Sequence, residues 1–414
     1  MAKPKLCLIP ATIGDKVYSI LPSDGVGDFD FDRASTATRI NAQGLIEEVA
    51  SGENRLNYSL LDGEVVGCPH LLLEPQATNV IINSNIFNPN TSVVVDTNNT
   101  ISPNGTLNAV KVTANSGTSL KLVDTNGASS GTYRFSVFAK KNTHNIIQLG
   151  GGGIIGHANF NLETGEYSSD GLMDYYGNGW YRCTVQFSAG TPSSHYISFS
   201  DSLSAARLST SVSDGSFYLY GMQSETTSYT TSYIPTSGST VTRVAETCTG
   251  SGDAATFNDS EGVLMAEISA LVDDQTRRQI SVSDGSVDNF VRFNYNDDGS
   301  NRIRFQIKSN TSIETSTTFT VNDIKEFHKV AIFYRLNDVK FFIDGFKVGT
   351  DPLATMPTGL DVLNFDQGNG FQDFYGKTKQ IQYFDSVLDS EQLEQLTSWD
   401  SFRAMAEGQL YTIE

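Results

Sequence analysis

The sequence predicts an all-β chain, in which two tandem antiparallel β-sandwiches follow an irregular β-rich N-terminal segment. Charged residues make up only 18% of the 414 positions, while 24 Phe and 17 Tyr supply large apolar side chains, and 36 glycines separate short apolar runs. Low charge with many aromatic residues is typical of strands rather than of helical bundles or disordered chains. Heptads and long repeats are missing from the sequence, so we do not expect a fibrous shaft.

The N-terminal segment, residues 1–78, contains short stretches with the period of a strand. Lys16–Leu21 alternates apolar with polar residues, and Asp28–Asp32 alternates acidic with aromatic residues. A period of two places alternate side chains on opposite faces of a strand. We expect this segment to dock on a larger particle or to brace the first sandwich.

Residues 79–246 predict the first sandwich and a linker. Thr132–Lys140 places Tyr, Phe, Val and Ala on one face, and similar runs recur with glycine turns at Thr164-Gly165, Asn178-Gly179 and Asp214-Gly215. Strands this short, separated by glycine turns, indicate a sandwich. Pro235 then disfavours helix at Ile234, so the exit should be extended.

Residues 247–414 predict the second sandwich and a short C-terminal helix. Val339–Gly349 forms a hairpin pattern that turns at Asp344-Gly345. The helix is expected at Asp389–Leu396, where Asp389 and Gln392 have the spacing of a capping box.

The first 246 residues resemble a family of bacteriophage virion proteins. The shared motifs are Phe31-Asp-Arg-Ala-Ser-Thr-Ala-Thr-Arg39, Gly44-Leu-Ile-Glu47, Arg55-Leu-Asn-Tyr58, Leu71–Asn79, Tyr218-Leu-Tyr-Gly-Met-Gln-Ser-Glu225, Thr230–Thr236 and Val241-Thr-Arg243. They resemble the leader and the carbohydrate-binding-module-like jelly roll of phage tail and capsid-appendage proteins. The resemblance implies a jelly-roll fold and a place on a virion.

The last domain resembles a different family. Phe342-Ile-Asp-Gly345, the later Ile381-Gln-Tyr-Phe-Asp385 and the helix after it are similar to the laminin-G/concanavalin-A-like lectin domain. This resemblance implies a lectin-like sandwich.

Catalytic patterns are weak, and we predict no catalytic residue and no enzyme. The sequence has no GxSxG elbow and no HExxH, and the GxGxxG match at Gly151–Gly156 runs into a strand pattern rather than a helix. Glycoside hydrolysis needs two carboxylates that flank the bond. Glu163 and Glu166 lie close in sequence, but they bracket a glycine turn, where solvated carboxylates are ordinary.

Two groups of residues are candidates for binding. Tyr175, Tyr176, Asn178 and Trp180 combine aromatic platforms with an amide, as glycan sites do, although Trp180 equally suits a core position. Four aspartates in two acidic turns could hold Ca²⁺, with ordinary solvated turn residues as the alternative: Asp273, Asp274, Asp297 and Asp298.

Charge and targeting signals limit the partners. The net charge of −19 repels phosphate backbones, so nucleic acid is not an expected partner. The N-terminal apolar run ends at Pro10, too early for a signal peptide, and no run is long enough to span a bilayer. The four cysteines are isolated and are expected to be free thiols. We therefore expect synthesis in a host cytoplasm and no membrane insertion.

These observations together predict a non-enzymatic structural protein on a virion surface: a head fibre, a capsid decoration or a short tail appendage. Its expected partners are other capsid or tail proteins, copies of itself, as the trimer that such appendages imply, and host-surface glycans. A tailspike-type polysaccharide depolymerase and a purely structural decoration that binds no glycan remain the alternatives. A bacterial adhesin is less favoured, because the chain shows no export signal.

Overall fold

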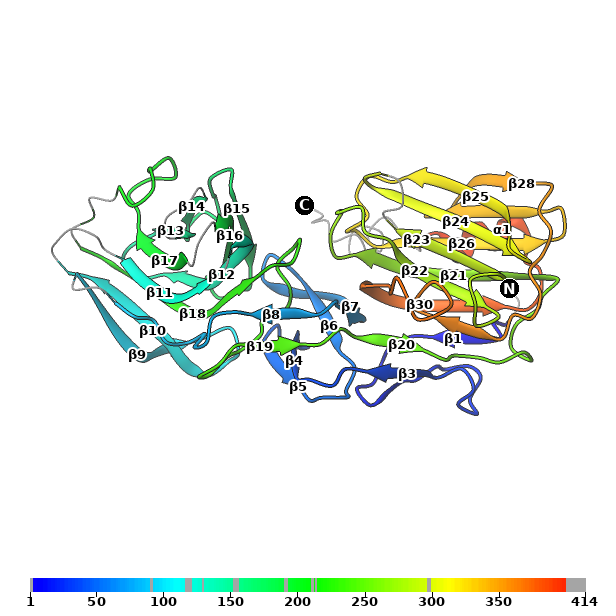
Figure 1. The fold of residues 1–414 in the computed structure, drawn as a ribbon, viewed down its shortest axis with the longest axis horizontal. Helices are drawn as coiled ribbons and strands as arrows, with labels where there is room; N and C mark the ends of the chain where they lie inside the picture. Colours follow the sequence, from blue (N-terminus) through cyan, green and yellow to red (C-terminus); the bar gives the residue numbers. More distant parts are fainter. Residues whose placement is uncertain are drawn as a thin grey trace.

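The computed structural model describes residues 3–89, 92–115, 121–128, 130–151, 156–189, 193–209, 212, 214–295 and 299–399. It shows two β-rich lobes that lie end to end, with the N-terminal segment running beneath and between them (Figure 1). The predicted all-β class, with two sandwiches in tandem, is confirmed. In the described part of the chain, no helix is long and apolar enough to cross a membrane.

The first lobe is a sandwich of two antiparallel sheets. One sheet has the order β15-β16-β12-β18-β10-β9, and the other has the order β11-β17-β13-β14. Inward side chains such as Phe135, Val137 and Phe160 are fully buried between the sheets. The strands are β9 (Val93–Ile101), β10 (Leu107–Ala114), β11 (Lys121–Ala128), β12 (Gly131–Lys141), β13 (Ile146–Gly151), β14 (His157–Asn161), β15 (Gly171–Tyr175), β16 (Trp180–Ala189), β17 (Ser193–Phe199) and β18 (Ser216–Glu225).

The second lobe is also a sandwich, with one sheet in the order β25-β24-β23-β22-β29 packed on another that contains β28-β27-β26-β21-β30. The hairpin turn at Asp344-Gly345 is confirmed, with φ of 49° and 86° at the two turn residues. Its strands are β21 (Glu261–Ala270), β22 (Arg278–Ser283), β23 (Phe290–Tyr295), β24 (Arg302–Ser309), β25 (Ser312–Thr320), β26 (His328–Arg335), β27 (Val339–Ile343), β28 (Phe346–Asp351), β29 (Val362–Asn364) and β30 (Gly376–Phe384). Helix α1 (Ser390–Thr397) begins after Asp389, and the capping box with Gln392 is present as predicted.

The N-terminal segment packs on both lobes, so the bracing expected for the first sandwich extends to the second, while docking on a larger particle stays a prediction. Strands β1 (Leu6–Leu8) and β7 (Glu64–Leu73) both pair with β30, and β7 also pairs with β6 (Leu56–Leu61). Leu6, Leu8 and Leu71 are thereby buried in the core of the second sandwich. Ile46 instead packs against Phe138 and Trp180 of the first sandwich.

Short strand pairs complete the connection between the lobes. The linker after the first sandwich forms β19 (Val241–Arg243) and β20 (Thr247–Thr249), which pair with strands of the N-terminal segment. The segment's remaining strands are β2 (Lys16–Val17), β3 (Phe29–Asp32), β4 (Ala37–Ile40), β5 (Ile46–Val49) and β8 (Ala77–Asn79). The strand predicted over Lys16–Leu21 is therefore only two residues long.

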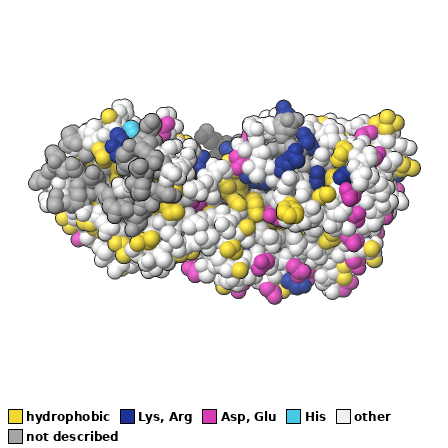
Figure 2. Space-filling model, viewed as in Figure 1, with side chains coloured by type: hydrophobic (Ala, Val, Ile, Leu, Met, Phe, Trp, Pro, Cys, Tyr) yellow, Lys and Arg dark blue, Asp and Glu magenta, His cyan; other side chains and the backbone are white. Residues whose placement is uncertain are grey.

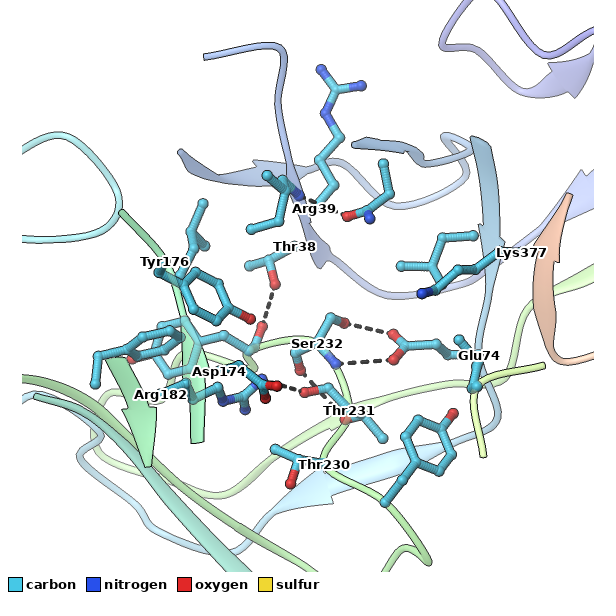
Figure 3. Close-up of a pocket in the computed structure, with 18 residues that line it drawn as sticks. Thr38, Arg39, Glu74, Asp174, Tyr176, Arg182, Thr230, Thr231, Ser232 and Lys377 are labelled. Carbon is cyan, nitrogen blue, oxygen red and sulfur yellow. Dashed lines mark hydrogen bonds between the residues drawn. The ribbon is translucent and has the colours of Figure 1, made fainter. Parts of the chain in front are cut away.

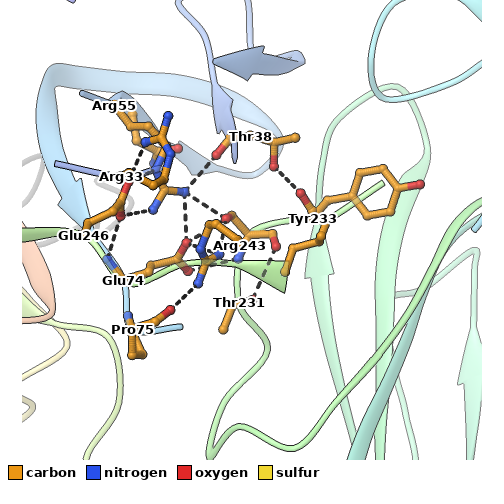
Figure 4. A network of polar contacts seen from close by, with 12 residues as sticks. Arg33, Thr38, Arg55, Glu74, Pro75, Thr231, Tyr233, Arg243 and Glu246 are labelled. Carbon is orange, nitrogen blue, oxygen red and sulfur yellow. Dashed lines mark hydrogen bonds and ion pairs between the residues drawn. The ribbon is translucent and has the colours of Figure 1, made fainter. Parts of the chain in front are cut away.

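A cluster of buried ion pairs fixes this connection (Figure 4). We call it the junction cluster; its members are Arg33, Arg55, Glu74, Arg243 and Glu246. Their side chains are at most 4% exposed. Glu246 accepts hydrogen bonds from Arg33 Nη1 (2.7 Å) and Arg55 Nε (2.8 Å), and Glu74 accepts one from Arg243 Nη1 (2.7 Å). Charges this deeply buried are tolerated only when they are paired, so each partner depends on the others.

Candidate binding site at the junction of the sandwiches

A polar pocket opens where the N-terminal segment and both sandwiches meet (Figure 3). Its volume is about 330 Å³, near the lower end of the roughly 300–1,000 Å³ that is usual for ligand sites. We call it the junction pocket. Its lining comes from all three parts of the chain: Thr38, Arg39, Ile40, Ile46, Asn57, Leu72, Glu74, Phe138, Asp174, Tyr176, Arg182, Tyr229, Thr230, Thr231, Ser232, Tyr233, Leu271 and Lys377.

One wall of the pocket is the extended stretch Thr230–Ile234, and buried side chains hold its backbone. Glu225 accepts from the Thr231 N–H (2.9 Å) and Gln223 accepts from the Ile234 N–H (2.6 Å). Glu74 of the junction cluster accepts from the N–H (2.9 Å) and the hydroxyl (2.6 Å) of Ser232. The Gln-x-Glu of the Tyr218–Glu225 motif therefore serves to position this wall.

Arg182 ties the same wall to the first sandwich. Its Nη1 donates to the Thr231 carbonyl (2.7 Å), and its guanidinium lies 5.3 Å from the centre of the Phe138 ring. Tyr176, on the loop after β15, points its hydroxyl toward the pocket in Figure 3. Burial raises the pKa of Tyr176, so the hydroxyl stays protonated and can donate a hydrogen bond.

Asp174, Lys377 and Tyr229 differ from the rest of the lining. Asp174 and Lys377 form no hydrogen bond or ion pair with the residues that the structure describes, and the buried Tyr229 hydroxyl has no hydrogen-bond partner among them. Asp174 is exposed at the pocket, yet the surrounding protein raises the pKa of its carboxyl group, with Arg182 and Lys377 acting in the opposite direction. Burial lowers the pKa of Lys377, which Asp174 partly offsets. The pocket thus offers an acceptor, a cation and a hydroxyl to a ligand.

Three of the four residues predicted to bind glycan line this pocket or the hollow next to it; Tyr175 lines neither. Tyr176 lines the junction pocket, and Tyr176, Asn178 and Trp180 also line a neighbouring hollow of about 360 Å³. Trp180 is only 2% exposed and donates its indole N–H to the Ile101 carbonyl (3.1 Å), as suits a core position. Tyr175 packs on Tyr181 with ring centres 4.8 Å apart.

The predicted Ca²⁺ ligands separate into two groups. Asp274 pairs with Arg278 (2.9 Å) and accepts from the Ser228 hydroxyl (2.6 Å), and Asp273 accepts from the Asn301 N–H (3.0 Å). Asp297 and Asp298 lie outside the described residues, as do residues 152–155 of the GxGxxG match. The described ranges contain no group of three or more His, Cys, Asp or Glu side chains suited to a metal ion.

The two glutamates considered for hydrolysis lie on an exposed turn. Glu163 pairs with Lys141 (2.6 Å), which lowers the pKa of Glu163, and Glu166 accepts from the Thr164 hydroxyl (2.9 Å). Neither residue lines the junction pocket. Their positions give them the role of solvated turn residues.

The second sandwich carries another polar surface, the outer face of the sheet β22–β25. Figure 2 shows Lys and Arg side chains gathered on this part of the second lobe. Two of its arginines bond to neighbouring strands: Arg292 donates to Gln306 (3.0 Å) and Arg304 donates to Thr318 (3.0 Å).

Sequence reasoning missed the main elements of the pocket. Asp174, Lys377 and Tyr229 stand in no motif, and the sequence pattern predicts only an extended exit from the first sandwich at Thr230–Ser232. One sequence signal for this wall was available. Gln223 and Glu225 both stand on the strand before the extended stretch, and buried amides and carboxylates need hydrogen-bond partners.

Comparison with known proteins assigns the second sandwich. Residues 252–394 match the family model of the concanavalin A-like lectin/glucanases superfamily, of laminin G type. The match confirms the resemblance found for the last domain: it has a lectin-like β-sandwich. No curated protein matches the chain in sequence.

Several solved structures resemble parts of this chain at low TM-scores. The CBM40 of the Ruminococcus gnavus IT-sialidase, bound to α2,3 sialyllactose, is 16% identical, with 36% of this chain and 88% of that chain covered and a TM-score of 0.31. A heptameric SAP-like pentraxin from Limulus polyphemus is 12% identical (34% and 72% covered, TM-score 0.28). Mouse laminin α1 domains LG4-5 are 10% identical (67% and 88% covered, TM-score 0.25). These TM-scores are too low to say anything about ligands, so the assignment stays with the family match: residues 252–394 are similar to the concanavalin A-like lectins and glucanases.

Proposed function

We propose that this chain is a glycan-binding structural protein of a bacteriophage virion surface and that the junction pocket is its binding site. The observation that carries the proposal is the lining of the pocket. Tyrosine rings, consecutive Thr and Ser residues and two charged groups surround one open volume; these two, Asp174 and Lys377, form no hydrogen bond or close ion pair within the described ranges. Sugars are bound by such combinations of aromatic surface and hydrogen-bonding groups.

Binding without hydrolysis fits the carboxylates of the pocket. A glycosidase needs two carboxylates that act on one bond. Glu74 is engaged by Arg55, Arg243 and Ser232, and these arginines lower its pKa to about 2 against the effect of burial. Asp174 is then the remaining carboxylate of the lining. We therefore favour adhesion over the depolymerase alternative.

The place on a virion, as a head fibre, capsid decoration or tail appendage, is supported by the resemblance of residues 1–246. Four charged residues of these motifs, Arg33, Arg55, Glu74 and Arg243, are buried in the junction cluster. Attachment to capsid or tail proteins would then use other surfaces of the chain. A trimer on a particle that displays many copies would turn weak single sites into firm adhesion through effective concentration.

The test is a pull-down of the purified full-length protein on bacterial envelope polysaccharides, with sugar release measured in parallel. We expect saturable binding and no released sugar. A parallel sample in EDTA examines the predicted Ca²⁺ dependence, and loss of binding there would support metal in or near the site. Absence of binding at high protein concentration would leave a purely structural decoration, and release of reducing sugar would favour the depolymerase.

A further inference from the structure

The junction pocket holds charged groups of both signs, but only some of them are neutralised by the protein. Arg39 pairs with Glu47 (2.6 Å), and Glu74 pairs with Arg55 (2.9 Å) and Arg243 (2.7 Å). Lys377 has no such partner among the described residues, although carboxylates lie near enough to affect its pKa. Its side chain points into the pocket from β30 (Figure 3).

Pairing between β30 and β7 fixes the position of Lys377. In the sheet register Lys377 lies opposite Leu72 of β7, and both residues line the pocket. Strand β7 leads directly into Glu74 of the junction cluster. Because β30 pairs with β7, Lys377 is held beside that cluster. Burial of the Lys377 ammonium is unfavourable and is only partly offset by the charge of Asp174, so an anionic ligand that pairs with it directly would lower this cost.

Asp174 and Tyr229, which make no hydrogen bond with the described part of the chain, suit the remainder of a sugar ring. The Asp174 carboxylate can accept hydrogen bonds from sugar hydroxyls, and the buried Tyr229 hydroxyl can donate or accept one. Asp174 also disfavours a ligand of high negative charge, because a doubly charged phosphate would be repelled by it. A singly charged carboxylate can pair directly with the Lys377 ammonium and is repelled less by Asp174.

We infer that the junction pocket recognises an acidic sugar unit, whose carboxylate pairs with Lys377 and whose hydroxyls reach Asp174 and Tyr229. This inference rests on the proposed glycan-binding function and adds the class of sugar. The volume of about 330 Å³ limits the bound part to one or two rings, so an acidic unit within a longer polysaccharide is the expected ligand.

The test uses the full chain on an array that presents each uronic-acid glycan as free acid and as methyl ester, together with neutral and phosphate-bearing glycans. The ester removes the charge and keeps the ring. We expect free acids to bind at least tenfold more tightly than their esters. Lys377→Met should lower the affinity for the acid to that for the ester, and the variant should no longer distinguish the two.

Controls separate charge recognition from folding. Lys111→Met, on β10 and outside the pocket, should keep the wild-type preference for the acid. Lys377→Met should melt at the wild-type temperature or above it, since the substitution removes a desolvated charge. Asp174→Asn should lower the affinity for acids and for esters to a similar degree.

Three results would overturn the inference and leave glycan binding intact: equal affinity for acid and ester, a preference for phosphate, or an acid preference that survives in Lys377→Met. If the wild-type chain binds no glycan on the array, the proposed function itself fails.

Discussion

Glu246→Gln is expected to destabilise the protein far more than an ordinary surface change. The Glu246 carboxylate is 0% exposed and accepts from Arg33 Nη1, Arg55 Nε, Arg55 Nη2 and the Glu74 N–H. The junction cluster contains three arginines and two glutamates, so it already carries one excess positive charge. Glutamine keeps one acceptor oxygen, but it raises the excess positive charge of the cluster to two. It also places an amide NH₂ donor next to a guanidinium, which is a donor as well.

Removal of one partner from a buried ion pair costs about 3–5 kcal/mol, because the remaining charge stays desolvated. The matched control is Glu47→Gln. Glu47 pairs with Arg39 at 2.6 Å, but its side chain is 43% exposed, so its loss should cost about 0.2–1 kcal/mol. The same chemical change is thus made in a buried and in a solvated pair.

Urea unfolding followed by fluorescence measures both costs. Trp180 is buried in the first lobe, and Trp399 lies 4.6 Å from Lys329 Nζ in the second, so the two tryptophans report on different lobes. We expect Glu246→Gln to lower the midpoint and to separate the transitions of the lobes. A loss no larger than that of Glu47→Gln would refute the view that the junction cluster holds the lobes together.

Three further outcomes follow from other buried groups. The folded pKa of Glu74, about 2, lies below its ordinary 4.5, so its contribution of about 3 kcal/mol is present above pH 4.5 and lost as pH falls toward 2; urea midpoints across this range should drop in the wild type and less in Glu74→Gln. Trp180→Phe removes the bond to Ile101 and should cost about 1–3 kcal/mol in urea unfolding while glycan affinity in the array assay stays within twofold; a large loss of affinity would move the site to the neighbouring hollow. Gly221→Ala should lower the free energy of unfolding by about 1–3 kcal/mol, because φ is +61° and a Cβ would lie 3.0 Å from the Tyr233 ring; an unchanged melting temperature would contradict this.

The parts of the fold that depend on residues close together in the sequence could be predicted. The alternation of Thr132–Lys140 became β12, the Asp344-Gly345 turn became the β27–β28 hairpin, and Asp389 caps α1. Each of these signals operates within about ten residues, where side-chain period and turn chemistry decide the structure.

The pairing of β1 and β7 with β30 could not be predicted in this way. Leu6–Leu8 is only three residues long, and its apolar pattern suits any buried edge. Its partner lies near the other end of the chain, so the choice depends on which sheet edge the completed second sandwich leaves open. Sequence pattern gives the face of such a strand but not its neighbour.

The same reasoning explains why the pocket escaped prediction although its supporting residues stand in recognisable motifs. Gln223, Glu225 and Glu74 occur in recognisable motifs, yet all three accept hydrogen bonds from the backbone of the wall Thr230–Ile234 and hold it in place. The groups left for a ligand, Asp174 and Lys377, are single residues on strands of different lobes. They lie close together because of the connection between the lobes: β7 pairs with β30 of the second sandwich, and Glu74, the residue after β7, belongs to the junction cluster. The motifs therefore encode the joint between the lobes, and the binding chemistry is supplied by unremarkable positions that the joint brings together.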